Sequence, residues 1–188
     1  AVALLHSFEF GASIAGFTDV AARDSSCAMA YWGIALSRWG NPMAAGARAP
    51  AQLALGRQAA ATAAQLSERT TARERAYAAA VGELFKDYER VDQRTRILAY
   101  ERAMQEMVTR HATDTEAVIF HALALTASAV PSDKTYTNQL KAGRILEAAW
   151  AKQPGHPGLA HYIIHTYDVP ALVPRATAAA RRYADIAP

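Results

Sequence analysis

The sequence predicts an all-α fold built from antiparallel helix pairs. Three observations support this fold class. The hydrophobic fraction is 52%, and alanine, the best helix former and the smallest core residue, is its most frequent member. Apolar residues recur at steps of three and four along most of the chain, and we find no convincing strand pattern. The segments between these helical patterns are mostly short, which favours antiparallel neighbours.

Nine segments show the helical spacing. Two of their starts carry a capping box, Thr71 with Glu74 and Thr113 with Glu116, in which the hydroxyl and the carboxylate each pair with a free backbone amide. Pro157 suits a first helical position, because its missing N–H would be unpaired there in any case. The expected helices cover residues 10–24, 27–39, 51–67, 72–87, 92–111, 115–128, 137–152, 157–168 and 174–186.

Two connections are longer than the others. They run from Gly40 to Pro50 and from Ala129 to Thr135. In a tightly packed helical array a longer loop is either a spacer or a lid over a site. We favour the spacer interpretation for both.

Internal self-similarity indicates a repeated helix pair. Residues 28–36 (AMAYWGIAL) resemble residues 117–125 (AVIFHALAL), since in both an aromatic residue precedes an aliphatic residue and an alanine by three and four positions. Small residues let paired helices approach, and bulky residues fill the space between pairs. This spacing resembles the tetratricopeptide repeat, a helix–turn–helix unit. The resemblance covers residues 10–40, 98–128 and 138–188, whereas residues 41–97 fit poorly.

The resemblance implies a fold, a binding mode and possible partners. Residues 153–168 are also similar to a stretch in longer, uncharacterised bacterial tetratricopeptide-like proteins. The family implies one domain over residues 1–188, stacked as a right-handed superhelix that binds a protein or peptide ligand in its concave groove. In the repeat register, Trp32, Leu36 and Trp39 line that groove. The repeat phase predicts a fragment of a longer solenoid, whose end faces are covered by further repeats or, in a homo-oligomer, by another copy.

Charge and composition exclude several classes of protein. The formal net charge is +3, and basic residues alternate with acidic ones instead of forming a stripe of one sign, so we expect no nucleic-acid partner. No apolar stretch reaches the roughly 18 residues of a membrane span. Cys27 is the single cysteine and allows no intrachain disulfide. The compartment therefore stays open: cytoplasmic or, if a signal peptide has been removed, periplasmic.

The sharpest candidate for chemistry is His161, His165 and Asp168. Spacings of four and three place the three side chains on one face of a helix, opposite its apolar side. Two imidazoles one turn apart can chelate a divalent ion, with a carboxylate as third ligand. The sequence therefore predicts one transition-metal ion, and it does not choose among Zn, Cu, Fe and Ni. A peptidase is not inferred, because the Glu of the zinc-protease motif is missing.

The repeat register decides what surrounds these histidines. In one register they face the groove, and His121 becomes a further ligand. In the other register His161 and His165 are buried between helices, where every ring nitrogen needs a partner.

Other polar residues are weaker candidates. His6 and Glu9 lie one helical turn apart and could add ligands, although they are distant in sequence. His111 and His156 fall at predicted turns and are interpreted as surface residues.

Two functions follow from these features. The first is a helical-repeat scaffold that binds a peptide or a helix in its groove. The alternative is a metal-dependent protein, redox or hydrolytic, that uses His161, His165 and Asp168; a third reading is a structural piece of a larger enzyme. The repeat register also predicts a buried core that includes Tyr31, Ile34, Phe120, Leu123, Ile163 and Tyr167.

Overall fold

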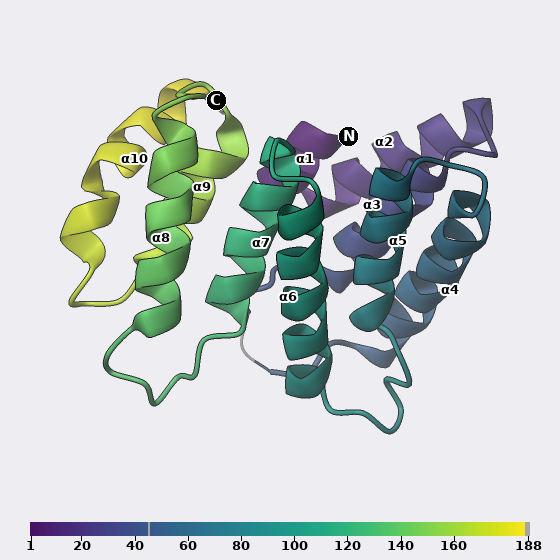
Figure 1. The fold of residues 1–188 in the computed structure, drawn as a ribbon, viewed down its shortest axis with the longest axis horizontal. Helices are drawn as coiled ribbons and strands as arrows, with labels where there is room; N and C mark the ends of the chain where they lie inside the picture. Colours follow the sequence, from purple (N-terminus) through teal and green to yellow (C-terminus); the bar gives the residue numbers. More distant parts are fainter. Residues whose placement is uncertain (45, 187–188) are drawn as a thin grey trace.

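The computed structural model describes residues 1–44 and 46–186, and its regular elements are all α-helices. The all-α prediction is confirmed for this part of the chain. Ten helices follow one another in the described residues (Figure 1): α1 (Val2–His6), α2 (Phe10–Arg23), α3 (Ala28–Trp39), α4 (Pro50–Ser67), α5 (Ala72–Glu83), α6 (Gln93–Arg110), α7 (Thr115–Ala127), α8 (Thr137–Trp150), α9 (Pro157–Thr166) and α10 (Val173–Ile186).

One of the two predicted capping boxes is confirmed. The Thr71 hydroxyl accepts from the Glu74 backbone N–H at 3.2 Å, and the Glu74 carboxylate accepts from the Thr71 backbone N–H at the start of α5. The box at Thr113 is wrong by one residue. Asp114 caps α7 instead, because its carboxylate accepts from the backbone N–H of Ala117. A carboxylate is a strong N-cap, and this register leaves Glu116 free of any capping role.

Helices α5 and α9 end four and two residues earlier than the periodicity predicts. Helix α5 ends at Glu83 because Leu84 and Phe85 turn into the core, where each is 1% exposed. Helix α9 ends at Thr166, and Tyr167 is fully buried with its hydroxyl donating to Glu147 of α8 at 2.9 Å. Asp168 therefore lies beyond the helix.

The helices form a row that follows the sequence, from α2–α5 at one end to α8–α10 at the other (Figure 1). Each helix packs against the next one along the chain. Helix α1 also follows this rule with α2, but it packs in addition against α9, which is far away in sequence. In a simple solenoid each unit contacts only its neighbours, so α1 departs from that scheme.

The core confirms most of the expected burial. Phe120, Leu123, Ile163 and Tyr167 are each at most 8% exposed. Tyr31 and Ile34 are partly buried and pack against this core, with more exposure than the other four.

The three expected groove residues lie in the core. Trp32, Leu36 and Trp39 are 4%, 8% and 3% exposed, so they do not line an open groove. The Trp32 ring makes edge-on contacts with Phe17, Tyr77 and Phe120, and it thereby joins α2, α3, α5 and α7. Leu36 and Trp39 border an apolar cavity of about 30 Å³, which also touches Leu5, Phe8 and Tyr162.

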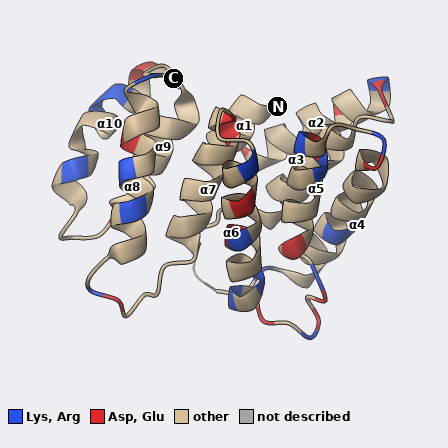
Figure 2. Cartoon of the chain, viewed as in Figure 1, with Lys and Arg blue, Asp and Glu red and all other residues tan. Residues whose placement is uncertain are grey.

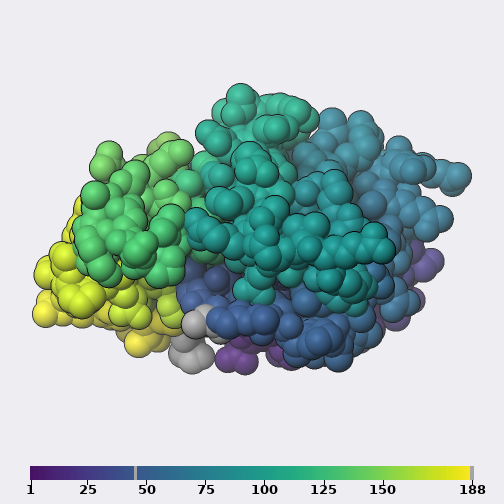
Figure 3. All heavy atoms as spheres, turned by 90° about the horizontal axis from the view of Figure 1, so that it is seen from below, coloured from purple at the N-terminus to yellow at the C-terminus, as the bar shows by residue number. Residues whose placement is uncertain are grey.

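The longer connection after α3 is fastened to α6. The Gln93 side chain accepts from the Arg48 backbone N–H at 3.0 Å and donates to the carbonyl oxygen of Gly46. Gly40 and Pro42 of this connection border the apolar cavity. Figure 3 shows the connection (blue) between the N-terminal residues (purple) and α6 (teal). This loop therefore covers part of the core.

Charged residues of both signs are distributed over the helices (Figure 2). Arg57 with Glu89 and Arg73 with Asp114 form ion pairs between helices or their flanking turns. Among the described residues, no helix is both long enough and apolar enough to cross a membrane.

Two glycines provide a matched test of the packing. A Cβ added at Gly33 in α3 would overlap the Phe17 ring, whereas a Cβ at Gly82 in α5 meets no neighbouring atom. We expect Gly33→Ala to lower the free energy of unfolding by about 1–3 kcal/mol through overpacking. Gly82→Ala should leave it unchanged or raise it by up to about 1 kcal/mol, since alanine favours the helix. Urea unfolding of both variants measures the difference, and equal effects would contradict the α2–α3 packing.

Candidate metal centre

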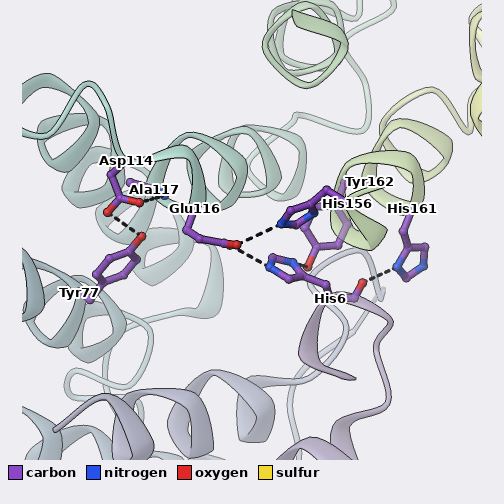
Figure 4. A network of polar contacts seen from close by, with 8 residues as sticks. All are labelled: His6, Tyr77, Asp114, Glu116, Ala117, His156, His161 and Tyr162. Atoms are coloured by element: carbon purple, nitrogen blue, oxygen red, sulfur yellow. Dashed lines mark hydrogen bonds and ion pairs between the residues drawn. The ribbon is translucent and has the colours of Figure 1, made fainter. Parts of the chain in front are cut away.

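Two histidines and a glutamate meet where α1, α7 and α9 converge (Figure 4). His6 is the last residue of α1, Glu116 lies in the first turn of α7, and His156 directly precedes α9. The Nε2 atom of His6 lies 2.9 Å from Oε2 of Glu116, and the Nε2 atom of His156 lies 3.0 Å from Oε1. One ligand atom from each of the three residues lies within 4.8 Å of the other two.

The protonation of this cluster follows from its acceptors. The ionised carboxylate of Glu116 only accepts, so both rings donate their Nε2–H to it. Tyr162 of α9 is 1% exposed, and burial raises the pKa of its hydroxyl well above 10. Its hydroxyl therefore keeps its proton and, when His6 is neutral, donates to Nδ1 of His6 across 3.0 Å.

Glu116 is held in its ionised form by these donors. Burial alone would raise the pKa of the carboxyl group. The hydrogen bonds from His156 and His6, and the positive charge that these rings carry when protonated, outweigh burial and lower the pKa to about 2. The cluster therefore keeps a carboxylate beside two imidazoles throughout the physiological pH range.

Local packing fixes the position of His6. Its ring stacks on Phe120 of α7 with a centroid distance of 5.0 Å, and the residue is only 1% exposed. Gly158 allows the close approach to α9, because a Cβ at this position would run into Nδ1 of His6. The site is therefore shaped by the first turn of α9 as well as by its three polar residues.

The other two residues of the cluster are more exposed to solvent. The side chains of Glu116 and His156 are 34% and 16% exposed, compared with 2% for His6. The Nδ1 atom of His156 is buried and has no hydrogen-bond partner among the described residues. This nitrogen is not the one that faces Glu116, and a water molecule is its expected partner.

The donor set fits a transition-metal ion. Two imidazoles and one carboxylate are the protein ligands of many catalytic zinc sites, and the same set holds iron in non-haem oxygenases. Ligand atoms about 2.0–2.1 Å from a tetrahedral ion lie about 3.3–3.4 Å apart. The present N···O distances of 2.9 and 3.0 Å would need to lengthen only slightly, and the two histidine nitrogens, which lie within 4.8 Å of one another, would need to reach the same spacing. The Tyr162 hydroxyl beside Nδ1 of His6 would orient that ligand from outside.

The predicted metal residues are arranged differently. His161 and His165 do lie on one face of α9, with their Nε2 atoms 3.0 Å apart. Asp168 lies beyond the end of α9 and is exposed, so it does not join them as a ligand on the helix face. His121 pairs with Glu101 of α6, at 3.2 Å from Nε2, and is not part of the pair.

The register that buries His161 between helices is the one the structure supports. His161 is 9% exposed, and both of its ring nitrogens have partners. Its Nδ1 atom lies 2.6 Å from the backbone carbonyl oxygen of His6, and its Nε2 atom faces His165. Burial lowers the pKa of both His161 and His165, which favours their neutral forms.

Of the weaker candidates from the sequence, His6 and His156 belong to the cluster, and Glu9 and His111 do not. His6 is a central member of the cluster, whereas its expected companion Glu9 is exposed and lies before α2. His156 was interpreted as a surface residue, and this is corrected by its contact with Glu116. His111 follows α6 and stays outside the cluster.

Glu116 is the functional candidate that sequence reasoning missed. Because Glu116 lies three residues after Thr113, the sequence predicts a capping role for it. Its contacts with His6 and His156, which are 110 and 40 residues away, were not predicted. Only the pairing of these distant segments would have revealed the site.

Comparison of the chain with protein-family models, curated proteins and solved structures gives no match.

The pKa of Glu116 gives a direct test of the cluster. We expect its carboxyl group to titrate near pH 2 in wild type, compared with an ordinary value of 4.5, and to titrate higher in His156→Ala, which lacks one donor. Because the folded-state pKa is depressed, the stabilisation from ionised Glu116 is present above about pH 4.5 and is lost as the pH falls towards 2. Carbon NMR of the side-chain carboxyl measures the midpoint, and an ordinary value in wild type would contradict the cluster.

Proposed function

We propose that this protein binds one divalent transition-metal ion through His6, Glu116 and His156. The observation that carries the proposal is the convergence of three ligand atoms, within 4.8 Å, from three separate helical segments. The hypothesis of a metal-dependent protein is thus kept, and its ligands are His6, Glu116 and His156 in place of the predicted set of His161, His165 and Asp168.

The ligand types support this proposal. Zn²⁺ and Fe²⁺ both accept two imidazoles and a carboxylate. Metal binding through the two Nε2 atoms would leave the proton of each neutral ring on Nδ1, where the Tyr162 hydroxyl oxygen can accept from His6, and the ion would take the place of the Nε2 protons beside Glu116. The buried position of His6 and its stacking on Phe120 hold one ligand in place before the ion arrives.

Three protein ligands leave a coordination position for water or a substrate. The more exposed side chains of Glu116 and His156 indicate that this position faces solvent. A bound Zn²⁺ in such a site acts as a Lewis acid and lowers the pKa of its water, which favours hydrolysis. The same set around iron supports redox chemistry.

The helical array serves as the scaffold of this site. Packing between consecutive helices is compatible with a tetratricopeptide-like right-handed superhelix. Binding of a peptide in a concave groove stays a prediction, and nothing in the placement of Trp32, Leu36 and Trp39 favours it. The metal function is therefore the one we put forward.

Metal titration tests the proposal directly. We expect wild type to bind one Zn²⁺ per chain at the cluster, and both His156→Ala and Glu116→Gln to weaken this binding by more than about 100-fold. Loss of an outer partner alone costs about 10–100-fold, and these variants remove ligands themselves. Calorimetry against a competing chelator gives the affinities, with His111→Ala as a control that should retain wild-type binding at the cluster. Unchanged affinity in both site variants would overturn the proposal.

A second test keeps all three proposed ligands and displaces only the His6 ring. Gly158→Ala places a methyl group against the His6 ring, whereas Gly155→Ala, three residues earlier, meets no atom. We expect only the Gly158 variant to lose affinity for Zn²⁺, by at least about tenfold, since it displaces a ligand without changing its chemistry. If both variants bind like wild type, His6 is not a ligand.

A further inference from the structure

A second pair of ring nitrogens in this chain is arranged for a ligand. The Nε2 atoms of His161 and His165 face one another at 3.0 Å, and the two ring centroids are 4.7 Å apart. Both rings are held from outside. Tyr183 of α10 stacks on His161 at 5.1 Å, and Phe8 stacks on His165 at 5.4 Å.

The partners of His161 determine which of its nitrogens is free to bind. The carbonyl oxygen of His6 only accepts, so Nδ1 of His161 carries the proton and donates it across 2.6 Å. In the neutral ring the lone pair is then on Nε2, directed at His165. An imidazole whose other N–H is donated to a backbone carbonyl is the usual arrangement of a metal-ligating histidine.

The ligand type selects among ions. The two Nε2 atoms lie 3.0 Å apart, so a small movement of either ring would bring both within bonding distance of one ion. Among the divalent first-row metals, Cu²⁺ has the highest affinity for nitrogen ligands.

We infer that His161 and His165 form a second metal site, a two-histidine chelate for Cu²⁺, separate from the site at Glu116. His165 would shift its proton from Nε2 to Nδ1, so the ion replaces one hydrogen bond and no net proton is released. The tautomer of His161 stays as it is, because the carbonyl oxygen of His6 holds its Nδ1–H.

A solvent-filled hollow beside His161 can supply the remaining coordination positions of the ion. His161 lines a hollow of about 640 Å³ together with Ser7, Glu9 and Tyr183. Water from this hollow would fill the remaining coordination positions on the His161 side of the ion, and the Glu9 carboxylate places negative charge at the same opening. The two metal sites meet at His6, whose ring belongs to the first and whose backbone carbonyl orients a ligand of the second.

The experiment isolates this site by removing the other. In His156→Ala, whose first site lacks a ligand, we expect one Cu²⁺ per chain with nitrogen hyperfine structure from two imidazoles in the electron paramagnetic resonance spectrum. Adding His165→Gln should reduce the Cu²⁺ affinity by more than about tenfold and remove one nitrogen from the spectrum. Adding His111→Gln instead is the matched control and should change neither.

Circular dichroism confirms that each variant is folded, and His161→Gln serves as a second variant with the same expectation, since its amide can still donate to His6. The inference is overturned if folded His156→Ala binds no Cu²⁺ at micromolar concentration, or if His165→Gln and His161→Gln bind it as well as their parent. Zinc binding at Glu116 does not enter these measurements, so either proposal can fail alone.

Discussion

The carboxylate of Glu116 connects three helices that the sequence keeps far apart. Each of its oxygens accepts from a different histidine, one on α1 and one in front of α9. Charge-assisted hydrogen bonds of this kind are shorter and stronger than neutral ones. They hold the end of α1 between α7 and α9, and the stacking of His6 on Phe120 and the contact of its backbone with His161 follow from that position. Without this junction α1 would have only α2 and α3 as partners.

The local part of the fold could be predicted because its causes are local. Spacing of apolar residues, a threonine cap and a proline at a first helical position depend on neighbours a few residues away, and nine of the ten described helices were found in this way. The failures occurred where burial of a single side chain decides the outcome. Phe85 ends α5 and Tyr167 follows the end of α9, because each gains more from the core than from continuing the helix.

The candidate site could be predicted only in part, for a physical reason. His6 is a candidate by residue type. Its partners Glu116 and His156 are 110 and 150 residues away, and the spacing of apolar residues carries no information about contacts over such distances. Glu116 was misassigned because a threonine and an aspartate compete to cap α7, and a shift of one residue changes the direction of every side chain in the first turn. The pair on α9 was predicted, because a spacing of four fixes its geometry within one helix.

The long-range docking of α1 also has a consequence for biosynthesis. Most helices of this chain meet their partners as soon as the next helix is made, but α1 must await α9, whose first residue is 157. At about 5–20 residues per second the ribosome needs on the order of 10–30 s to pass from α1 to the start of α9. Throughout this interval His6 and Glu116 lack His156, so the nascent chain cannot form the complete cluster. The metal site that we propose would therefore be assembled only after nearly all of these helices have emerged.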